Sequence, residues 1–191
     1  MRILKVLALS VMVLISSVFA ESFMIDKPHT NVGFKVKHLL VSSINGNFRT
    51  FDGNIEFDYM KKQLIGVNGT ISVASIDTNN IKRDDHLKSP DFFDAAKFPD
   101  MKFVSTKVDG DYLWGDLTIK GTTKNVKFEI EDIGTVVGPK GNKRVGFVLT
   151  AKINRLDYGL NWNKLLEAGG AIVSKDIKLI IEMEGIAKKM M

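Results

Sequence analysis

Alternation of apolar and polar residues is the dominant pattern of the chain after about residue 21. Val32, Phe34 and Val36 share one face of a strand, and Lys35 and Lys37 take the other. A period of two residues is typical of half-buried β-strands. Comparable rows recur, separated by turn residues, at 55–57, 67–73, 101–108, 112–120, 126–130, 145–153 and 177–183. The pattern predicts about eight strands and an all-β protein.

Strands with one apolar face must bury that face, either as a sandwich or as a closed barrel. Closure also removes exposed sheet edges. An eight-stranded barrel is just wide enough for its own side chains or for one small ligand, and composition does not separate these two cases. Two short helices are predicted in addition, at Ile81–Leu87 and Leu160–Glu167.

The first twenty residues have the pattern of a secretory signal peptide. Arg2 and Lys5 precede an apolar stretch from Val6 to Ile15, and small residues lead to Ala20. This stretch is too short for a stable transmembrane anchor. We therefore expect a signal peptide at 1–20, an exported mature protein and a single domain at 21–191.

Charge and cysteine content narrow the function classes. The formal net charge falls from +5 to +3 when Arg2 and Lys5 are removed, and the remaining charges are interspersed. This disfavours nucleic acid as a partner. The chain contains no cysteine, which excludes disulfides and thiol catalysis and suits an oxidising compartment.

A charged and aromatic insert at 78–99 interrupts the strands. It contains Arg83, Asp84 and His86, followed by Phe92 and Phe93. Asp84 and His86 could form an acid–base pair. The favoured alternative is structural: Asp84 or Asp85 caps a short helix, and Arg83 pairs with a nearby carboxylate.

Other catalytic chemistry has little support in the sequence. His29 and His38 lie at opposite ends of one strand, about 30 Å apart, so they cannot bind one metal ion with His86 unless the strand bends sharply. No Gly-x-Ser-x-Gly motif or phosphate-binding glycine loop is present. We expect no metal, no cofactor and no enzymatic activity.

Several motifs occur in an order that resembles one known family. They are Asp26-x-x-His29-Thr30-x-x-x-Phe34, Gly46-x-Phe48, Phe51-x-Gly53, Ser75-Ile76-x-Thr78-Asn79, Arg83-Asp84-x-His86-Leu87-x-Ser89-x-Asp91-Phe92-Phe93-Asp94, Gly115-x-Leu117-Thr118-Ile119-x-Gly121 and Arg155-x-Asp157-Tyr158-Gly159. Over residues 22–186 the chain resembles the YceI-like family of bacterial periplasmic, polyisoprenoid-binding proteins. The resemblance implies a lipocalin-like, extended antiparallel barrel with a long apolar cavity, and possible homodimers.

The leading hypothesis is a periplasmic carrier for a long-chain isoprenoid or fatty amphiphile. We expect Phe92 and Phe93 to cover the cavity, and Arg83, Asp84 and His86 to lie near its mouth or to fix the insert. The alternative is an enzyme that acts on an apolar substrate through His86 and Asp84. The aromatic residues expected to line the cavity are Phe34, Phe48, Phe57, Phe103, Trp114, Phe128 and Phe147; a one-residue register error would reverse these faces.

Overall fold

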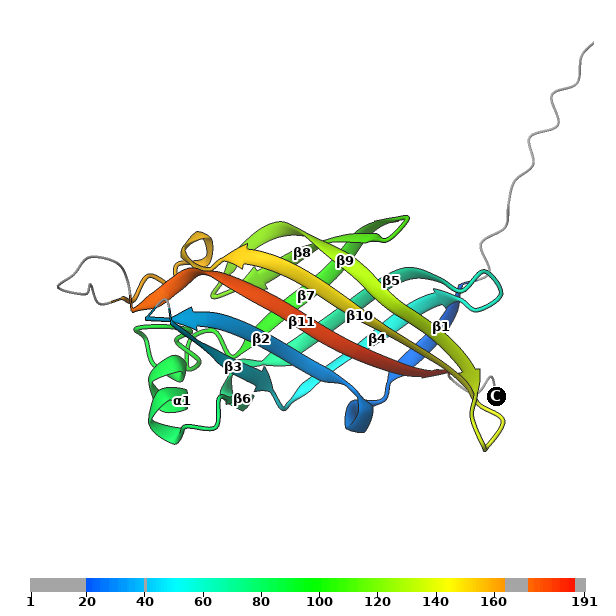
Figure 1. The fold of residues 1–191 in the computed structure, drawn as a ribbon, viewed down its shortest axis with the longest axis horizontal. Helices are drawn as coiled ribbons and strands as arrows, with labels where there is room; N and C mark the ends of the chain where they lie inside the picture. Colours follow the sequence, from blue (N-terminus) through cyan, green and yellow to red (C-terminus); the bar gives the residue numbers. More distant parts are fainter. Residues whose placement is uncertain (1–19, 40, 164–171, 188–191) are drawn as a thin grey trace, which may run out of the picture.

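A computed structural model describes residues 20–39, 41–163 and 172–187, which form a sheet of eleven strands (Figure 1). Besides the strands, it contains one α-helix and three short 3-10 helices. The strands are β1 (Glu21–Ile25), β2 (Asn31–His38), β3 (Ser42–Phe48), β4 (Phe51–Asp58), β5 (Gln63–Ser72), β6 (Ile76–Asp77), β7 (Asp100–Asp109), β8 (Tyr112–Ile119), β9 (Thr122–Val137), β10 (Lys143–Asn154) and β11 (Val173–Ala187). The helices are α1 (Ile81–Lys88), η1 (Lys27–His29), η2 (Val73–Ser75) and η3 (Arg155–Tyr158).

Strand β1 closes the sheet into a barrel. It pairs with β4 along one edge and with β11 along the other, where Phe23 lies opposite Ala187. The ring runs β1-β4-β5-β7-β8-β9-β10-β11, and every neighbouring pair in it is antiparallel. This confirms the predicted eight-stranded antiparallel barrel. The rest of the β11 edge, from Val173 to Glu182, pairs with β2, and β3 and β6 continue the wall from β2.

The inner face at the β1 end of the barrel is densely packed. Phe23, Ile55 and Phe57 have no solvent-exposed surface, and Leu64 and Val145 are about as deeply buried. The Phe23 and Phe57 rings meet edge to face, with centroids 6.2 Å apart. Such contacts add to the area that the rings bury, so this end of the barrel is a solid core.

Helix α1 and the turn of η3 both lie at the other end of the barrel (Figure 1). The predicted helix at Ile81–Leu87 is confirmed as α1. For the second predicted helix, residues 160–163 are not helical and 164–167 lie outside the described residues. The predicted signal peptide, apart from Ala20, also lies outside them. In the described part of the chain, no helix has the length and hydropathy needed to span a bilayer.

Replacing Phe57 with Ala should lower the free energy of unfolding by about 3–5 kcal/mol, because it leaves a cavity in a filled core. Urea unfolding measures this. The matched control is Trp114→Ala, which removes an aromatic ring from the outer face of β8 and should cost about 1 kcal/mol or less. An equal loss of unfolding free energy in the two variants would contradict the conclusion that the β1 end of the barrel is a filled core.

Candidate ligand-binding cavity

The interior of the barrel between the packed end and α1 is hollow. A cavity of about 180 Å³ lies there, lined almost entirely by apolar side chains. An apolar cavity of about 150 Å³ stays dry and accepts a benzene-sized guest. The size and lining of this cavity therefore suit an apolar ligand group.

Six of the nine aromatic residues expected at the binding site line this cavity. Phe103 and Phe128 meet edge to face at 5.3 Å, and Phe34 lies 5.8 Å from Phe48. Phe93 packs edge-on against Phe48 at 6.1 Å. The insert thus contributes Phe92 and Phe93 to the cavity wall, beside the barrel aromatics.

The other three expected lining residues lie elsewhere. Phe57 and Phe147 point inward but are buried in the apolar core and do not line the cavity. Trp114 is on the outside, because Leu113, Gly115 and Leu117 form the inward row of β8. Its ring packs against Tyr112 and lies near the Lys107 and Lys127 ammonium groups.

Two glycines keep the cavity open. A Cβ atom at Gly115 would lie 2.3 Å from Cζ of Phe103, and one at Gly46 would lie 2.4 Å from Cζ of Phe34. Both rings therefore rest against bare backbone. A larger residue at either glycine would push its ring away from that position.

A buried hydrogen-bond network holds the insert. Asp84 Oδ1 accepts from the backbone N–H and the hydroxyl of Thr78, at 3.0 and 2.5 Å. Arg83 donates from Nε to the Thr78 hydroxyl and from Nη2 to the Thr78 carbonyl, both at 2.7 Å. The structural interpretation was therefore wrong in its details. Asn80 caps the helix through Arg83 N–H, and Arg83 bonds Thr78 instead of a carboxylate.

His86 connects the insert to the chain after η3. Its Nε2 lies 3.0 Å from Oδ2 of Asp91, and its ring meets the rings of Phe92 and Trp162 edge-on at 5.1 and 4.9 Å. Asp84 is bonded to Thr78 and shares no hydrogen bond with His86. Arg83, Asp84 and His86 do not line the cavity, so the structure does not assemble the proposed acid–base pair.

Sequence reasoning missed two groups of lining residues. One is the aliphatic row Ile177, Leu179, Ile181 and Met183 of β11, whose period of two was visible in the sequence but was not weighed against the aromatics. The other is Arg155, which lines the cavity with 3% of its surface exposed. Burial lowers the pKa of its guanidinium, while burial and then the charge of Asp157 raise the pKa of nearby Tyr158 to about 12.

A family model for the YceI-like domain matches residues 23–185. The chain belongs to the YceI-like family. UPF0312 proteins of Staphylococcus epidermidis and Staphylococcus aureus are 39% and 40% identical to it, over 82% of this chain and 92% of theirs. The crystal structure of a Campylobacter jejuni YceI protein is 37% identical, with a TM-score of 0.69 over 86% of this chain and 96% of that one.

More distant structures share the YceI-like fold. Burkholderia cenocepacia BcnA is 23% identical, with a TM-score of 0.65 over 84% of this chain and 98% of its own. A domain from Saccharophagus degradans, described as polyisoprenoid-binding and implicated in plant cell wall breakdown, is 12% identical with a TM-score of 0.61. It covers 88% of this chain, and this chain covers 99% of it.

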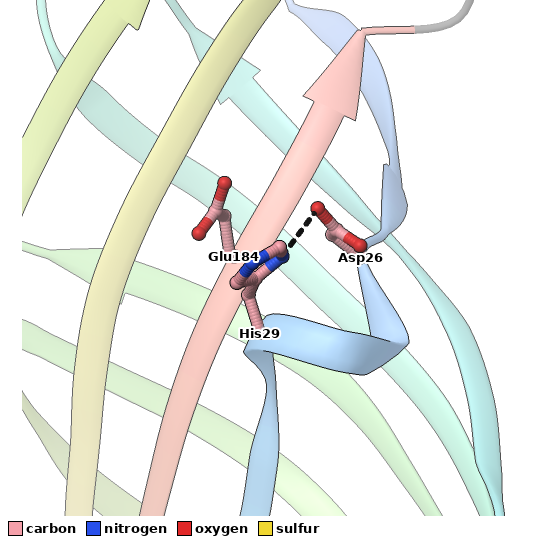
Figure 2. A group of neighbouring side chains, drawn as sticks. All are labelled: Asp26, His29 and Glu184. Carbon is pink, nitrogen blue, oxygen red and sulfur yellow. Dashed lines mark hydrogen bonds and ion pairs between the residues drawn. The ribbon is translucent and has the colours of Figure 1, made fainter.

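One group of possible metal ligands lies at the seam of this YceI-like barrel, outside the cavity. Asp26, His29 and Glu184 place three ligand atoms within 4.8 Å of one another (Figure 2). His29 Nδ1 lies 2.9 Å from Asp26 Oδ2, and Arg144 Nη1 donates to the same oxygen at 2.7 Å and also to Glu184. Arg144 already forms an ion pair with each of the two carboxylates. The group is therefore an ion-pair network that fastens η1 and β10 to β11.

Replacing Asp84 with Ala should cost about 1.5–3 kcal/mol, because it leaves the buried Thr78 N–H without its charged acceptor. Urea unfolding measures the loss, and hydrogen exchange should show faster exchange in the backbone amides of 78–95. Asp85→Ala is the control: that side chain is exposed and forms a surface ion pair with Lys88, worth about 0–1 kcal/mol. Similar behaviour of both variants would refute the fixing role of Asp84.

Acid should weaken the seam through Asp26. Burial alone would raise the pKa of this carboxyl, but hydrogen bonds from Arg144 and His29 outweigh it and hold the pKa below its usual value. The stabilisation is fully present above the unfolded pKa of about 3.9, and is lost as pH falls through the lower folded pKa. Asp26→Asn should therefore lower stability at pH 7 and flatten the decline between about pH 4 and 2, measured by urea midpoints. Asp111→Asn, which removes a turn carboxylate without an ion pair among the described residues, should leave that decline unchanged.

Proposed function

We propose that this protein is a periplasmic binding protein that carries a long-chain isoprenoid or fatty amphiphile in its barrel. The observation that carries the proposal is the apolar cavity of about 180 Å³ beside a solid core. The description of the Saccharophagus degradans domain as polyisoprenoid-binding adds support. The signal-peptide pattern at 1–20 and the resemblance to a family of bacterial periplasmic proteins support the periplasmic assignment.

The physical chemistry of the lining favours a hydrocarbon tail. Burying each methylene group gains about 0.8 kcal/mol. The affinity for a tail therefore grows with the number of methylenes that the cavity admits, less the costs of association. A tail can therefore bind tightly without polar contacts along its length.

The contacts of the insert favour a role in covering the tail over a role as a catalytic loop. Phe92 and Phe93 supply cavity surface, and the polar residues Arg83, Asp84 and His86 engage other parts of the chain. No observation on the described residues favours the enzyme alternative.

A homodimer remains a prediction, which light scattering with and without lipid would test.

A tryptophan within the cavity should displace the ligand. Leu179 lies opposite Phe34 on β2 and lines the cavity, so Leu179→Trp should lower the lipid content per protein at least tenfold. Native mass spectrometry and solvent extraction measure that content. The hollow interior has room for the ring, so the loss of stability should stay within the roughly 1–3 kcal/mol typical of overpacking.

The matched control is Lys178→Trp, which places the same ring on the exposed outer face one residue away. It should retain lipid at the wild-type stoichiometry of about one per barrel. Wild-type protein that is purified without detergent and carries no amphiphile, and that binds none when it is offered, would refute the proposal.

A further inference from the structure

Arg155 is a buried cation in the wall of an apolar cavity. It begins η3, directly after β10, and its neighbours in the lining include Ile153, Leu160 and Val173. Of the described lining residues, only Arg155 and Asp52 carry a charge. Asp52 is exposed, whereas Arg155 is buried.

The hydrogen-bond partners of Arg155 are all uncharged. Nε donates to the Ser174 carbonyl at 3.0 Å, Nη2 to the Val173 carbonyl at 3.3 Å, and Nη1 to the Leu160 carbonyl. Within the described residues no carboxylate pairs with it, although a guanidinium has five N–H donors. Among the described residues, two of the five N–H donors of Arg155 therefore have no acceptor, and its positive charge has no negative partner.

A structural role explains only part of this arrangement. The three bonds fasten the turn after η3 to the start of β11, but bonds to carbonyls need only N–H donors and no charge. Burying an uncompensated cation is costly, and burial lowers the pKa of this guanidinium without deprotonating an arginine near neutral pH. The charge is the feature that the fold itself leaves unexplained.

We propose that Arg155 selects the head group of the bound amphiphile, favouring a carboxylate or phosphate monoester over an uncharged head on the same tail. This inference rests on the proposed binding function and extends it to the head group. An anion with two oxygen acceptors matches the planar donor fork of a guanidinium.

The test compares three ligands with the same sixteen-carbon tail: hexadecanol, palmitate and hexadecyl phosphate. Delipidated wild-type protein should bind the two anions about tenfold to hundredfold more tightly than the alcohol at pH 7.5, the range expected for a charge-assisted hydrogen bond. Acetate and inorganic phosphate, which lack a tail, should bind negligibly. Binding of inorganic phosphate as tight as that of hexadecyl phosphate would indicate a free-anion site and overturn the assignment.

Arg155→Gln keeps two N–H donors for the three carbonyls but removes the charge. It should bind hexadecanol within about threefold of wild type and lose the preference for anions. The control Arg49→Gln removes a charge from an exposed arginine paired with Asp77, and it should keep the preference. An unchanged preference in Arg155→Gln would overturn the inference, as would equal loss of all three ligands.

A readout on wild-type protein covers the case in which Arg155→Gln does not fold. The Nε–H resonance of Arg155 should shift when palmitate binds and stay nearly unchanged with hexadecanol, and no such difference would refute the head-group role. If palmitate and hexadecanol bind equally, only the head-group inference fails. If neither binds, the proposed function fails as well.

Discussion

The pairing of β1 on both of its edges is the constraint on which the rest of the barrel depends. Without β1, β4 would present a free edge, and so would the end of β11 that β2 does not cover. Exposed edges invite pairing with other chains. Side chains reinforce this short seam. Phe23 is completely buried in β1, the Thr30 hydroxyl accepts from the Glu184 N–H at 3.1 Å, and Arg144 joins Asp26 to Glu184. Closure at eight strands then fixes how wide the interior can be.

Within that fixed width, local packing decides which part of the barrel is solid and which is hollow. Glycine has opposite effects at the two ends. At Gly185, a Cβ would lie 2.9–3.2 Å from Ile55, Phe23 and Val145, so the missing side chain lets the core close. At Gly115 the missing side chain lets the Phe103 ring lie against the wall, beside open volume. The alternation of apolar residues along a strand is the same in both cases. It indicates which side chains point inward, but not whether they fill the space between them.

That limit explains which parts of the molecule could be predicted. Alternation and turn residues were enough for about eight strands, but their closure into a barrel was predicted from the family resemblance. The charged segment 81–87 was enough for the helix. Trp114 was misplaced because a large aromatic was given more weight than its neighbours Leu113 and Leu117, whose row is interrupted by Gly115. Phe57 was correctly placed inward, but its contact with Phe23 depends on β1 and β4 being paired, which no local pattern reports. The partners of Asp84 and Arg155 likewise depend on backbone groups that only the fold brings into place.

The division between tail and head group follows from the same geometry. Affinity for a tail grows with the apolar area that it buries and distinguishes poorly between saturated, branched and isoprenoid chains of similar size. A wall of phenylalanine and aliphatic side chains therefore requires only that the ligand be sufficiently hydrophobic, and it does not select one kind of tail over another. Discrimination has to come from the few polar groups that face the ligand. Arg83, Asp84 and His86 are already engaged in holding the insert, and Asp52 is exposed and paired with Lys27. Among the described lining residues, that leaves Arg155 as the source of chemical selectivity.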